Sequence, residues 1–297
     1  MRNKKSTIFI FLGPAVLLYL LVFLYPALRT VVMSFFDVKN ITSGVSDWVF
    51  IGTENFKKLF DTRLFLESMK NIFKIWAIDG VITLFLSLLT AIILTSNIRF
   101  KRFFRAVIYL PNVIAAVAVG YMWILYVFNN RFGLLTSLFT KLGLESLAAI
   151  QWTDQSHIFI SMSIAYIFCN VGYYMLIYIA AIEKIPADYF EAARIDGAGA
   201  LRRFFSITMP LIKSVFASTL VLWTTRVMGF FELSLVFSDI TTVTPMVYTY
   251  NALFGTEASV EGMNVGVAAA AAVVMTAMVM LAFLISRKLI REDPIET

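Results

Sequence analysis

The chain has 297 residues, of which 60% are hydrophobic and only 15% are charged, and its mean hydropathy is +0.81. A soluble domain usually carries about a quarter charged residues, so a chain this apolar would expose hydrophobic surface and aggregate in water. The net charge of +6 does not indicate a nucleic-acid partner, because the basic residues lie largely in the connections between apolar runs, a pattern that orients membrane proteins.

Six apolar segments reach the length of about 20 residues that a membrane-spanning helix needs. In chain order they are residues 8–33, 73–96, 106–128, 157–182, 214–237 and 264–286. The first follows basic residues, as a signal peptide would, but its apolar stretch exceeds the roughly 7–15 residues of a signal core, and no A-x-A-like site follows. We therefore expect an all-α membrane protein with about six transmembrane helices, the first of them retained.

Basic residues in the connections set the expected orientation. Loop 97–105 carries four basic residues and no acid, segment 183–213 carries five basic residues, and residues 239–262 contain no Lys or Arg. We therefore expect both termini, loop 97–105 and segment 183–213 in the cytoplasm. Segments 36–72, 129–156 and 239–262 are then expected outside.

The expected organisation is a short cytoplasmic N-terminus (1–7), a transmembrane domain (8–290) and a cytoplasmic tail (291–297). Within the outer segment 36–72 and just beyond it, residues 54–74 place apolar side chains at helical spacing. This pattern predicts an amphipathic helix at the membrane interface.

Segment 183–213, with the sequence EKIPADYFEAARIDGAGALRRFFSITMPLIK, is too long and too patterned for a simple connection. Pro186 suits the first turn of a helix, and Gly197 suits a left-handed residue at its end. A second helix is expected after Gly199, with Leu201, Phe204, Phe205 and Thr208 on one side, and Pro210 marks the return to the membrane. The residues alone fit an ordinary interfacial helix pair as well as a surface that a partner approaches closely.

The same segment resembles the EAA motif found in membrane subunits of bacterial ABC importers. The matching residues are Glu191, Ala192, Ala193, Asp196, Gly197, Ala198, Phe204, Ile207 and Pro210. Further matches resemble the carbohydrate-uptake branch of these binding-protein-dependent permeases, and they include Asn55, Asn71, Pro111 and Gly133. The sequence departs from that branch in two places, because SDITTVTPMVYTY (238–250) has no GGP element and Ser214 replaces a second proline.

The resemblance implies the transmembrane fold of a type I ABC importer in the bacterial plasma (inner) membrane. It implies that the EAA helix docks on a cytoplasmic ATPase dimer, with Glu191 and Gly197 as the main coupling residues. The other implied partners are a second, homologous permease subunit that completes a heterodimer, an extracellular or periplasmic solute-binding protein, a carbohydrate substrate and the lipid bilayer. This chain would bind no cofactor and catalyse no reaction, because ATP and Mg²⁺ would be held by the ATPase.

Polar and aromatic residues within the spans are candidates for contact with a sugar along the pathway. They are Tyr121, Trp123, Asn170, Tyr173, Tyr174, Trp223, Arg226 and Glu232. The tyrosines and tryptophans also fit membrane-interface belts or core packing, and Asp79 fits helix packing better than a pathway. The single cysteine, Cys169, and the single histidine, His157, exclude most zinc sites and Cys–His pairs, so no metal site is expected.

Two other classes of protein are weaker alternatives. An ion-driven secondary transporter predicts internal repeats and broken helices at the bilayer midplane, and the sequence shows no convincing repeat. An integral membrane enzyme needs a catalytic cluster, which one His and one Cys make difficult to build. The sequence contains no G-x-x-x-x-G-K-[ST] phosphate loop, so an ATP-driven mechanism requires a second chain for hydrolysis.

Overall fold

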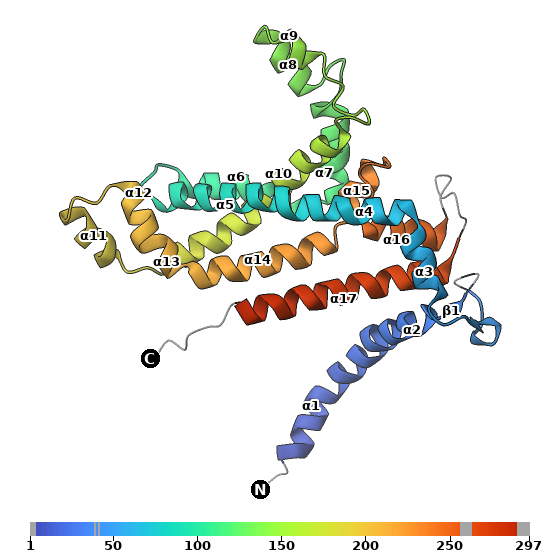
Figure 1. The fold of residues 1–297 in the computed structure, drawn as a ribbon. Helices are drawn as coiled ribbons and strands as arrows, with labels where there is room; N and C mark the ends of the chain where they lie inside the picture. The colour runs from blue at the N-terminus through green and yellow to red at the C-terminus, as the bar shows by residue number, and fades with distance from the viewer. Residues whose placement is uncertain (1–3, 39, 41, 256–262, 290–297) are drawn as a thin grey trace. The chain divides into compact units, whose positions relative to one another are not determined.

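The computed structural model describes residues 4–38, 40, 42–255 and 263–289 (Figure 1). Regular structure in these residues is almost entirely helical. The exception is a short antiparallel pair, β1 (Phe36–Asp37) and β2 (Val49–Phe50). The chain forms two compact units, Met1–Leu66 with Pro245–Met278 and Glu67–Thr244 with Val279–Thr297. Each unit is described by itself.

The first unit begins with one long helical segment. A π-helical turn, Leu20–Leu24, joins α1 (Lys4–Tyr19) to α2 (Tyr25–Met33). This turn ends two residues before Pro26, which has no N–H to donate to the previous turn. At the end of the π-helical turn, the Tyr25 N–H bonds to the Leu20 carbonyl, five residues back. The segment therefore passes a proline without ending, and Ile10–Met33 is long and apolar enough to span a membrane.

Asn55 holds the rest of the first unit together. Its other helices are α3 (Glu54–Asp61), the start of α4 (Arg63–Lys74), α16 (Pro245–Phe254) and most of α17 (Val265–Leu289). The buried Nδ2 of Asn55 donates to the carbonyls of Ser34 (3.0 Å) and Phe36 (2.8 Å). Gly266 of α17 lies so close that a Cβ there would be 2.5 Å from this amide nitrogen and 2.6 Å from the Phe36 carbonyl oxygen. One buried amide thus fixes α3, β1 and α17 against one another.

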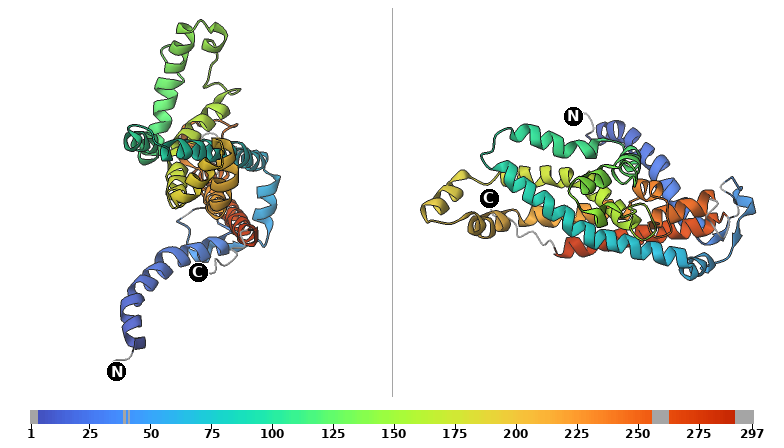
Figure 2. Two further views of the ribbon diagram at one scale, coloured as in Figure 1. Left: turned by 90° about the vertical axis from the view of Figure 1, so that its left-hand side faces the viewer. Right: turned by 90° about the horizontal axis from the view of Figure 1, so that it is seen from above.

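The second unit contains the remaining helices, arranged around α10. They are α5 (Gly80–Thr95), α6 (Lys101–Val113), α7 (Ala116–Met122), α8 (Leu134–Lys141), α9 (Glu145–Ala148), α10 (Ile158–Ile182), α11 (Ala187–Ile195), α12 (Ala200–Arg203), α13 (Met209–Leu211), α14 (Lys213–Met228) and α15 (Glu232–Val236). Figures 1 and 2 show α8 and α9 projecting away from α5, α10 and α14.

Helix α10 packs on α5, α6 and α14 through small residues and buried hydroxyl groups. Ser87 of α5 donates to the Val171 carbonyl of α10 at 2.9 Å. The Tyr178 hydroxyl of α10 lies 2.8 Å from Thr219 Oγ1 of α14. A Cβ at Gly172 would lie 2.6 Å from Tyr109 Cα and would overlap the Ile108 carbonyl oxygen, both on α6. Small residues therefore allow the helix backbones to approach closely, as is common in membranes.

The expected spans are confirmed at five places, where helices long and apolar enough to cross a membrane occur. The expected span over 106–128 is present as a bent pair, because α6 and the helix Ala116–Val127 meet at an angle of 99°. Ile114 (ψ 142°) and Ala115 (ψ 128°) are extended and interrupt the helix. Hydropathy does not reveal such a break because the residues on both sides are apolar. The count is six spans if this bent pair crosses as one.

The expectation of a single interfacial helix over 54–74 is wrong. Thr62 is extended (ψ 112°) and separates α3 from α4. Helix α4 then continues through the π-helical turn Ile75–Asp79 into α5, which gives one span of 33 residues, Arg63–Thr95. The amphipathic pattern is present, but its second half forms the N-terminal part of a helix long and apolar enough to span a membrane.

We expect Gly172→Ala to destabilise the second unit, because the added methyl group would collide with backbone atoms of α6 that cannot rotate away. Overpacking of this kind costs about 1–3 kcal/mol and should lower the unfolding temperature in detergent by roughly 2–10 °C. The buried single cysteine, Cys169, allows unfolding to be followed with a thiol-reactive dye. Gly13→Ala is the control, because nothing lies within 4 Å of a Cβ at Gly13; equal melting of the two variants would contradict the packing.

Candidate coupling segment and membrane pathway

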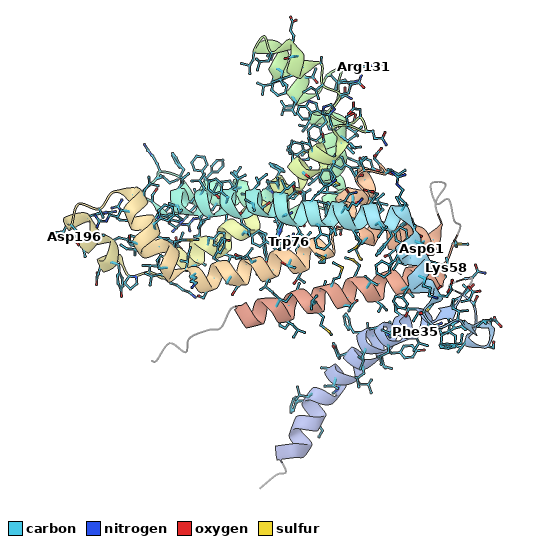
Figure 3. The ribbon with its side chains drawn as sticks, viewed as in Figure 1. Phe35, Lys58, Asp61, Trp76, Arg131 and Asp196 are labelled. Atoms are coloured by element: carbon cyan, nitrogen blue, oxygen red, sulfur yellow. The ribbon has the colours of Figure 1, made fainter. Side chains whose placement is uncertain are left out.

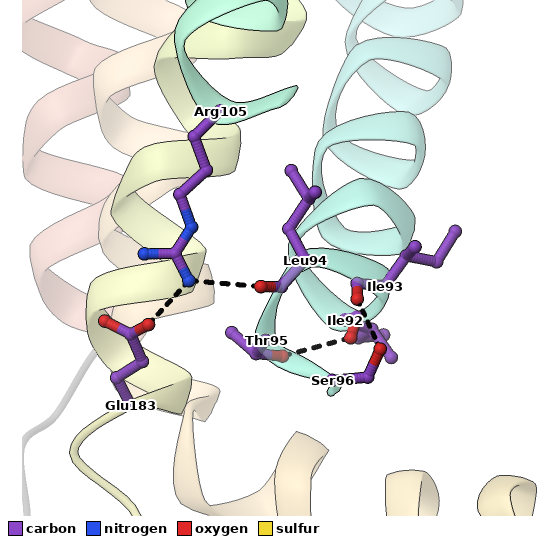
Figure 4. A network of polar contacts seen from close by, with 7 residues as sticks. All are labelled: Ile92, Ile93, Leu94, Thr95, Ser96, Arg105 and Glu183. Carbon is purple, nitrogen blue, oxygen red and sulfur yellow. Dashed lines mark hydrogen bonds and ion pairs between the residues drawn. The ribbon is translucent and has the colours of Figure 1, made fainter. Parts of the chain in front are cut away.

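An ion pair fixes the point where the 183–213 segment leaves the helix bundle. Arg105 of α6 places one guanidinium nitrogen 2.6 Å from Glu183 Oε1, and the same nitrogen donates to the Leu94 carbonyl at 3.1 Å (Figure 4). Glu183 caps the C-terminal end of α10, and Leu94 lies in the last turn of α5. The Arg105 side chain is 21% exposed and that of Glu183 is 50% exposed. One arginine therefore joins the ends of three helices at the base of the segment.

A rigid turn ends α11, the first helix of the segment. Gly197 has φ +73°, its N–H bonds to the Arg194 carbonyl (3.1 Å), and the Ala198 N–H bonds to the Ala193 carbonyl (2.8 Å). These two bonds define a Schellman motif, in which the left-handed position strongly favours glycine. The expected glycine turn is confirmed. Gly199, in contrast, has φ −66° and open space around its Cβ position, so the backbone does not require glycine there.

The second half of the segment returns to the bundle through a π-helical turn. Helix α12 continues into the turn Phe204–Thr208, where the Met209 N–H bonds to the Phe204 carbonyl, and Pro210 follows. Thr208 is only 6% exposed, whereas Leu201 is 76% and Phe205 is 65% exposed. The expectation that these three share one side is therefore wrong. The π turn inserts an extra residue and rotates Thr208 away from the exposed face.

The residues that match the EAA motif line the outside of this segment. Glu191, Ala192, Asp196, Gly197 and Pro210 are exposed, and Ala193, Ala198, Phe204 and Ile207 are half-buried. Figure 3 shows Asp196 at the tip of the segment, away from α5 and α10.

Large apolar side chains are also exposed on this segment, next to the motif. Ile195 is 87% exposed and Tyr189 is 55% exposed. Sequence reasoning missed both residues. The available signal was an isoleucine standing between Arg194 and Asp196 in an otherwise polar turn. Together with Leu201 and Phe205, they give the segment an apolar surface that the described residues leave uncovered.

Three of the pathway candidates, Asn170, Tyr174 and Trp223, are buried in helix packing. Trp223 of α14 donates its indole N–H to the Trp76 carbonyl (2.9 Å), and its ring lies over Gly80, where a Cβ would be 2.9 Å from Cε2. Asn170 donates to the Tyr166 carbonyl within α10 (2.8 Å). These contacts give Asn170 and Trp223 structural roles in the second unit.

Tyr173 and Arg226 are brought together by the fold. The Arg226 guanidinium carbon lies 5.0 Å from the centre of the Tyr173 ring, Arg226 is exposed, and Tyr173 is half-buried. Glu232 is exposed at the start of α15, and no ion pair joins it to Arg226 among the described residues. The structure therefore joins two candidates from different helices into one small cluster.

Two further candidates lie elsewhere in the second unit. Trp123 is half-buried and packs against the tilted ring of Phe128 and edge-on against Phe168, with ring centroids 5.1 and 5.3 Å apart. Tyr121 is exposed on α7. We find no hydrogen bond or ring contact that joins either residue to the Tyr173–Arg226 cluster within the described parts of the chain.

The single histidine has a local role at the start of α10. Asp154 Oδ1 accepts from the His157 backbone N–H (3.0 Å) and lies 2.8 Å from its Nδ1. The hydrogen bond with the imidazole holds the pKa of Asp154 below its usual range. Among the described residues, no group of three or more His, Cys, Asp and Glu is arranged to hold a metal ion.

A bundle of apolar spanning helices, with one long exposed helix–turn–helix between α10 and α14, is the architecture of a membrane subunit of a transport system. Residues 83–292 match the family described as the binding-protein-dependent transport system inner membrane component. The chain belongs to this family and is an integral membrane transport protein.

Individual relatives agree with the family assignment. The chain is 32% identical to the probable ABC transporter permease protein YurN of Bacillus subtilis, over 72% of this chain and 73% of YurN. It is 28% identical to the sulfoquinovosyl glycerol transport system permease protein SmoG of Agrobacterium fabrum, over 94% of this chain and 89% of SmoG.

The fold is shared with a solved transporter. A chain of the bacterial alginate ABC transporter, crystallised with an alginate pentasaccharide-bound periplasmic protein, superposes with a TM-score of 0.81. The sequences are 20% identical, and the match covers 97% of this chain and 95% of that one. The expected ABC importer fold is thus confirmed, although 20% identity indicates no more than the fold.

We expect Arg105→Ala to destabilise the base of the segment more than Glu183→Ala, because it also leaves the Leu94 carbonyl without its partner. For a partly exposed pair the coupling in a double-mutant cycle should be about 0.5–1 kcal/mol and should fall in 1 M salt. Thermal unfolding of the two single variants and the double variant in detergent measures it. Additive effects of the two substitutions would show that the ion pair contributes nothing.

Proposed function

We propose that this chain is one of two permease subunits of an ATP-binding-cassette importer, and that it forms half of the translocation pathway for a carbohydrate. The second, homologous permease subunit completes the pathway. A cytoplasmic ATPase dimer supplies the energy, and an extracellular or periplasmic binding protein delivers the sugar. The observation that carries this proposal is the exposed helix–turn–helix of residues 183–213.

The geometry of this segment supports a contact with a partner protein. Exposed apolar side chains next to small residues and one carboxylate are typical of surfaces that another protein covers. Glu191 is placed for a charge-assisted hydrogen bond, and the alanines around it let a partner backbone approach. Gly197 fixes the direction of the second half of the segment relative to α11.

The energy source must lie on another chain. The sequence has no phosphate-binding loop of the G-x-x-x-x-G-K-[ST] type, so we assign ATP and Mg²⁺ to the ATPase and no cofactor to this chain. In the proposed mechanism, closure of the ATPase dimer draws together the coupling segments of the two permease subunits. The spanning helices then change from an inward-open to an outward-open packing, as a rigid-body switch between two states.

The names of the relatives support a saccharide-like substrate. They include permease proteins of a diacetylchitobiose uptake system, of a sulfoquinovosyl glycerol transport system and of a starch degradation products transport system. Aromatic faces combined with hydrogen-bonding side chains, as at Tyr173 and its neighbours, suit sugar recognition. We therefore take an oligosaccharide, disaccharide or related sugar as the transported solute.

We expect Gly197→Val to abolish uptake and substrate-stimulated ATP hydrolysis. A β-branched residue at φ +73° is strained by at least about 1–2 kcal/mol, which redirects the turn although no neighbouring atom blocks the side chain. The measurement is uptake and ATPase activity of the complete importer in proteoliposomes. Gly199→Ala, two residues along the same segment, is the matched control and should transport normally because its backbone suits any residue.

Co-purification of the ATPase gives an independent readout of the same pair of variants. Gly197→Val should insert into the membrane and bind the second permease subunit but retain the ATPase poorly. Normal uptake by Gly197→Val, or equal damage by Gly199→Ala, would argue against the role of the turn in coupling.

We also expect the coupling segment to face the cytoplasm. In a Cys169→Ala background, a cysteine introduced as Lys184→Cys should react with an impermeant maleimide in inverted vesicles but not in right-side-out spheroplasts. Gln155→Cys, just before α10, should show the opposite pattern. Both positions are exposed. Labelling of Lys184→Cys from the outside would overturn both the orientation and the proposed contact with the ATPase.

A further inference from the structure

Arg226 is a charged side chain well inside a membrane span. Its helix begins at Lys213, so Arg226 lies 13 residues, or about 20 Å, along α14, and the span continues to Val236. A guanidinium group that faces hydrocarbon is costly, and charged residues in spans face the bundle interior or a water-filled space. The exposed side of α14 at Arg226 is therefore a side that meets protein or the transported solute.

The positive charge of Arg226 is not neutralised within the described parts of the chain. None of the four ion pairs found there includes it, and it makes no hydrogen bond to those residues. Glu232 is the nearest acid along the sequence, six residues further on, but the two do not pair. The five N–H donors of a guanidinium are thus available to a group that is absent from this chain.

Aromatic side chains of α10 hold Arg226 in place. The Tyr173 ring lies 5.0 Å from its guanidinium carbon, a distance typical of cation–π contact. Tyr173 packs edge-on against Tyr174 at 5.1 Å, and Tyr174 packs on Trp223 at 5.9 Å. Because these rings are fixed by packing, the arginine is oriented before any ligand arrives, which reduces the entropy lost on binding.

A second donor without a partner lies in the same cluster. Tyr174 is 0% exposed, and its hydroxyl has no hydrogen-bond partner among the described residues. Trp223, against which Tyr174 packs, lies three residues before Arg226 on α14. The exposed guanidinium of Arg226 therefore lacks an acceptor, and the acceptor that it binds most strongly is an anion.

We propose that Arg226 and Tyr173 form a subsite for an anionic group on the transported saccharide. The group is a carboxylate, phosphate ester or sulfonate, each of which matches the planar fork of a guanidinium. The Tyr173 ring offers a face beside the anion against which the sugar ring packs. This inference rests on the proposed import of a carbohydrate and adds to it the charge of the substrate.

The experiment uses the complete importer in proteoliposomes and pairs of related probes, one anionic and one neutral. The pairs are a labelled disaccharide uronate with its methyl ester, and a hexose 6-phosphate with the free hexose. We expect wild-type uptake to favour an anionic probe. Arg226→Gln should reduce the anionic-to-neutral ratio of kcat/KM about tenfold, the value of one charge-assisted hydrogen bond. Arg226→Lys should fall between wild type and Arg226→Gln, because an ammonium keeps the charge but lacks the planar fork.

Lys58→Gln is the control for the loss of a positive charge, since Lys58 is exposed on α3, and it should leave the ratio unchanged. An unchanged ratio in Arg226→Gln would overturn the inference. An equal loss of uptake of both probes would also overturn it, because that result is expected if Arg226 pairs with a carboxylate of the second subunit. Uptake of neutral probes alone would also overturn it while leaving carbohydrate import intact. If the importer and its binding protein take up and bind no saccharide at all, the proposed function fails, and the anionic subsite fails with it.

Discussion

The requirement that buried backbone be fully hydrogen-bonded inside a bilayer governs this molecule more than any single side chain. Only helices meet that requirement along a spanning segment, and prolines inside helices threaten it. The chain adapts with π-helical turns. The turn Leu20–Leu24 ends two residues before Pro26, and the turn Phe204–Thr208 ends two residues before Pro210. In each turn a backbone N–H bonds to the carbonyl five residues back, in place of the one four residues back, and the helix continues.

The same requirement explains why glycine and hydroxyl residues mark the packing around α10. Helices in lipid gain no hydrophobic advantage from contact with each other, so close van der Waals packing and interhelical hydrogen bonds must hold them. Gly80 under the Trp223 ring, Gly172 against α6, and the Tyr178–Thr219 pair meet this need in the second unit. A framework held in this way has a few discrete packings and resists gradual deformation, as a rigid-body switch requires.

Sequence patterns predicted those parts of the structure that depend on local chemistry. Runs of apolar residues located the spans, and Gly197 located the left-handed turn, because each signal is contained within a few residues. The bend at Ile114–Ala115 was not predictable in this way, since it depends on backbone torsions in a uniformly apolar stretch. The Arg105–Glu183 pair joins residues 78 positions apart, so it could not be predicted from the pattern of neighbouring residues. Residue type alone also could not distinguish Trp223, which is buried between helices, from Tyr173, which lies beside the exposed charge of Arg226.

A single helix links the two surfaces to which we assign function. Near the end of the coupling segment, Ile212 is only 1% exposed. Helix α14 begins at Lys213, the last residue of the segment, and carries Arg226 about 20 Å further along. The buried Ile212 and Trp223 fix both parts of this helix against the rest of the second unit, so α14 moves with that unit and cannot tilt freely. If an ATPase docks on the coupling segment as proposed, a force applied there would reach the Arg226 cluster through α14 and the helices packed on it. In the proposed importer, energy coupling and substrate contact would then share one helix, and the lifetime of the bound solute would depend on the same movement that ATP drives.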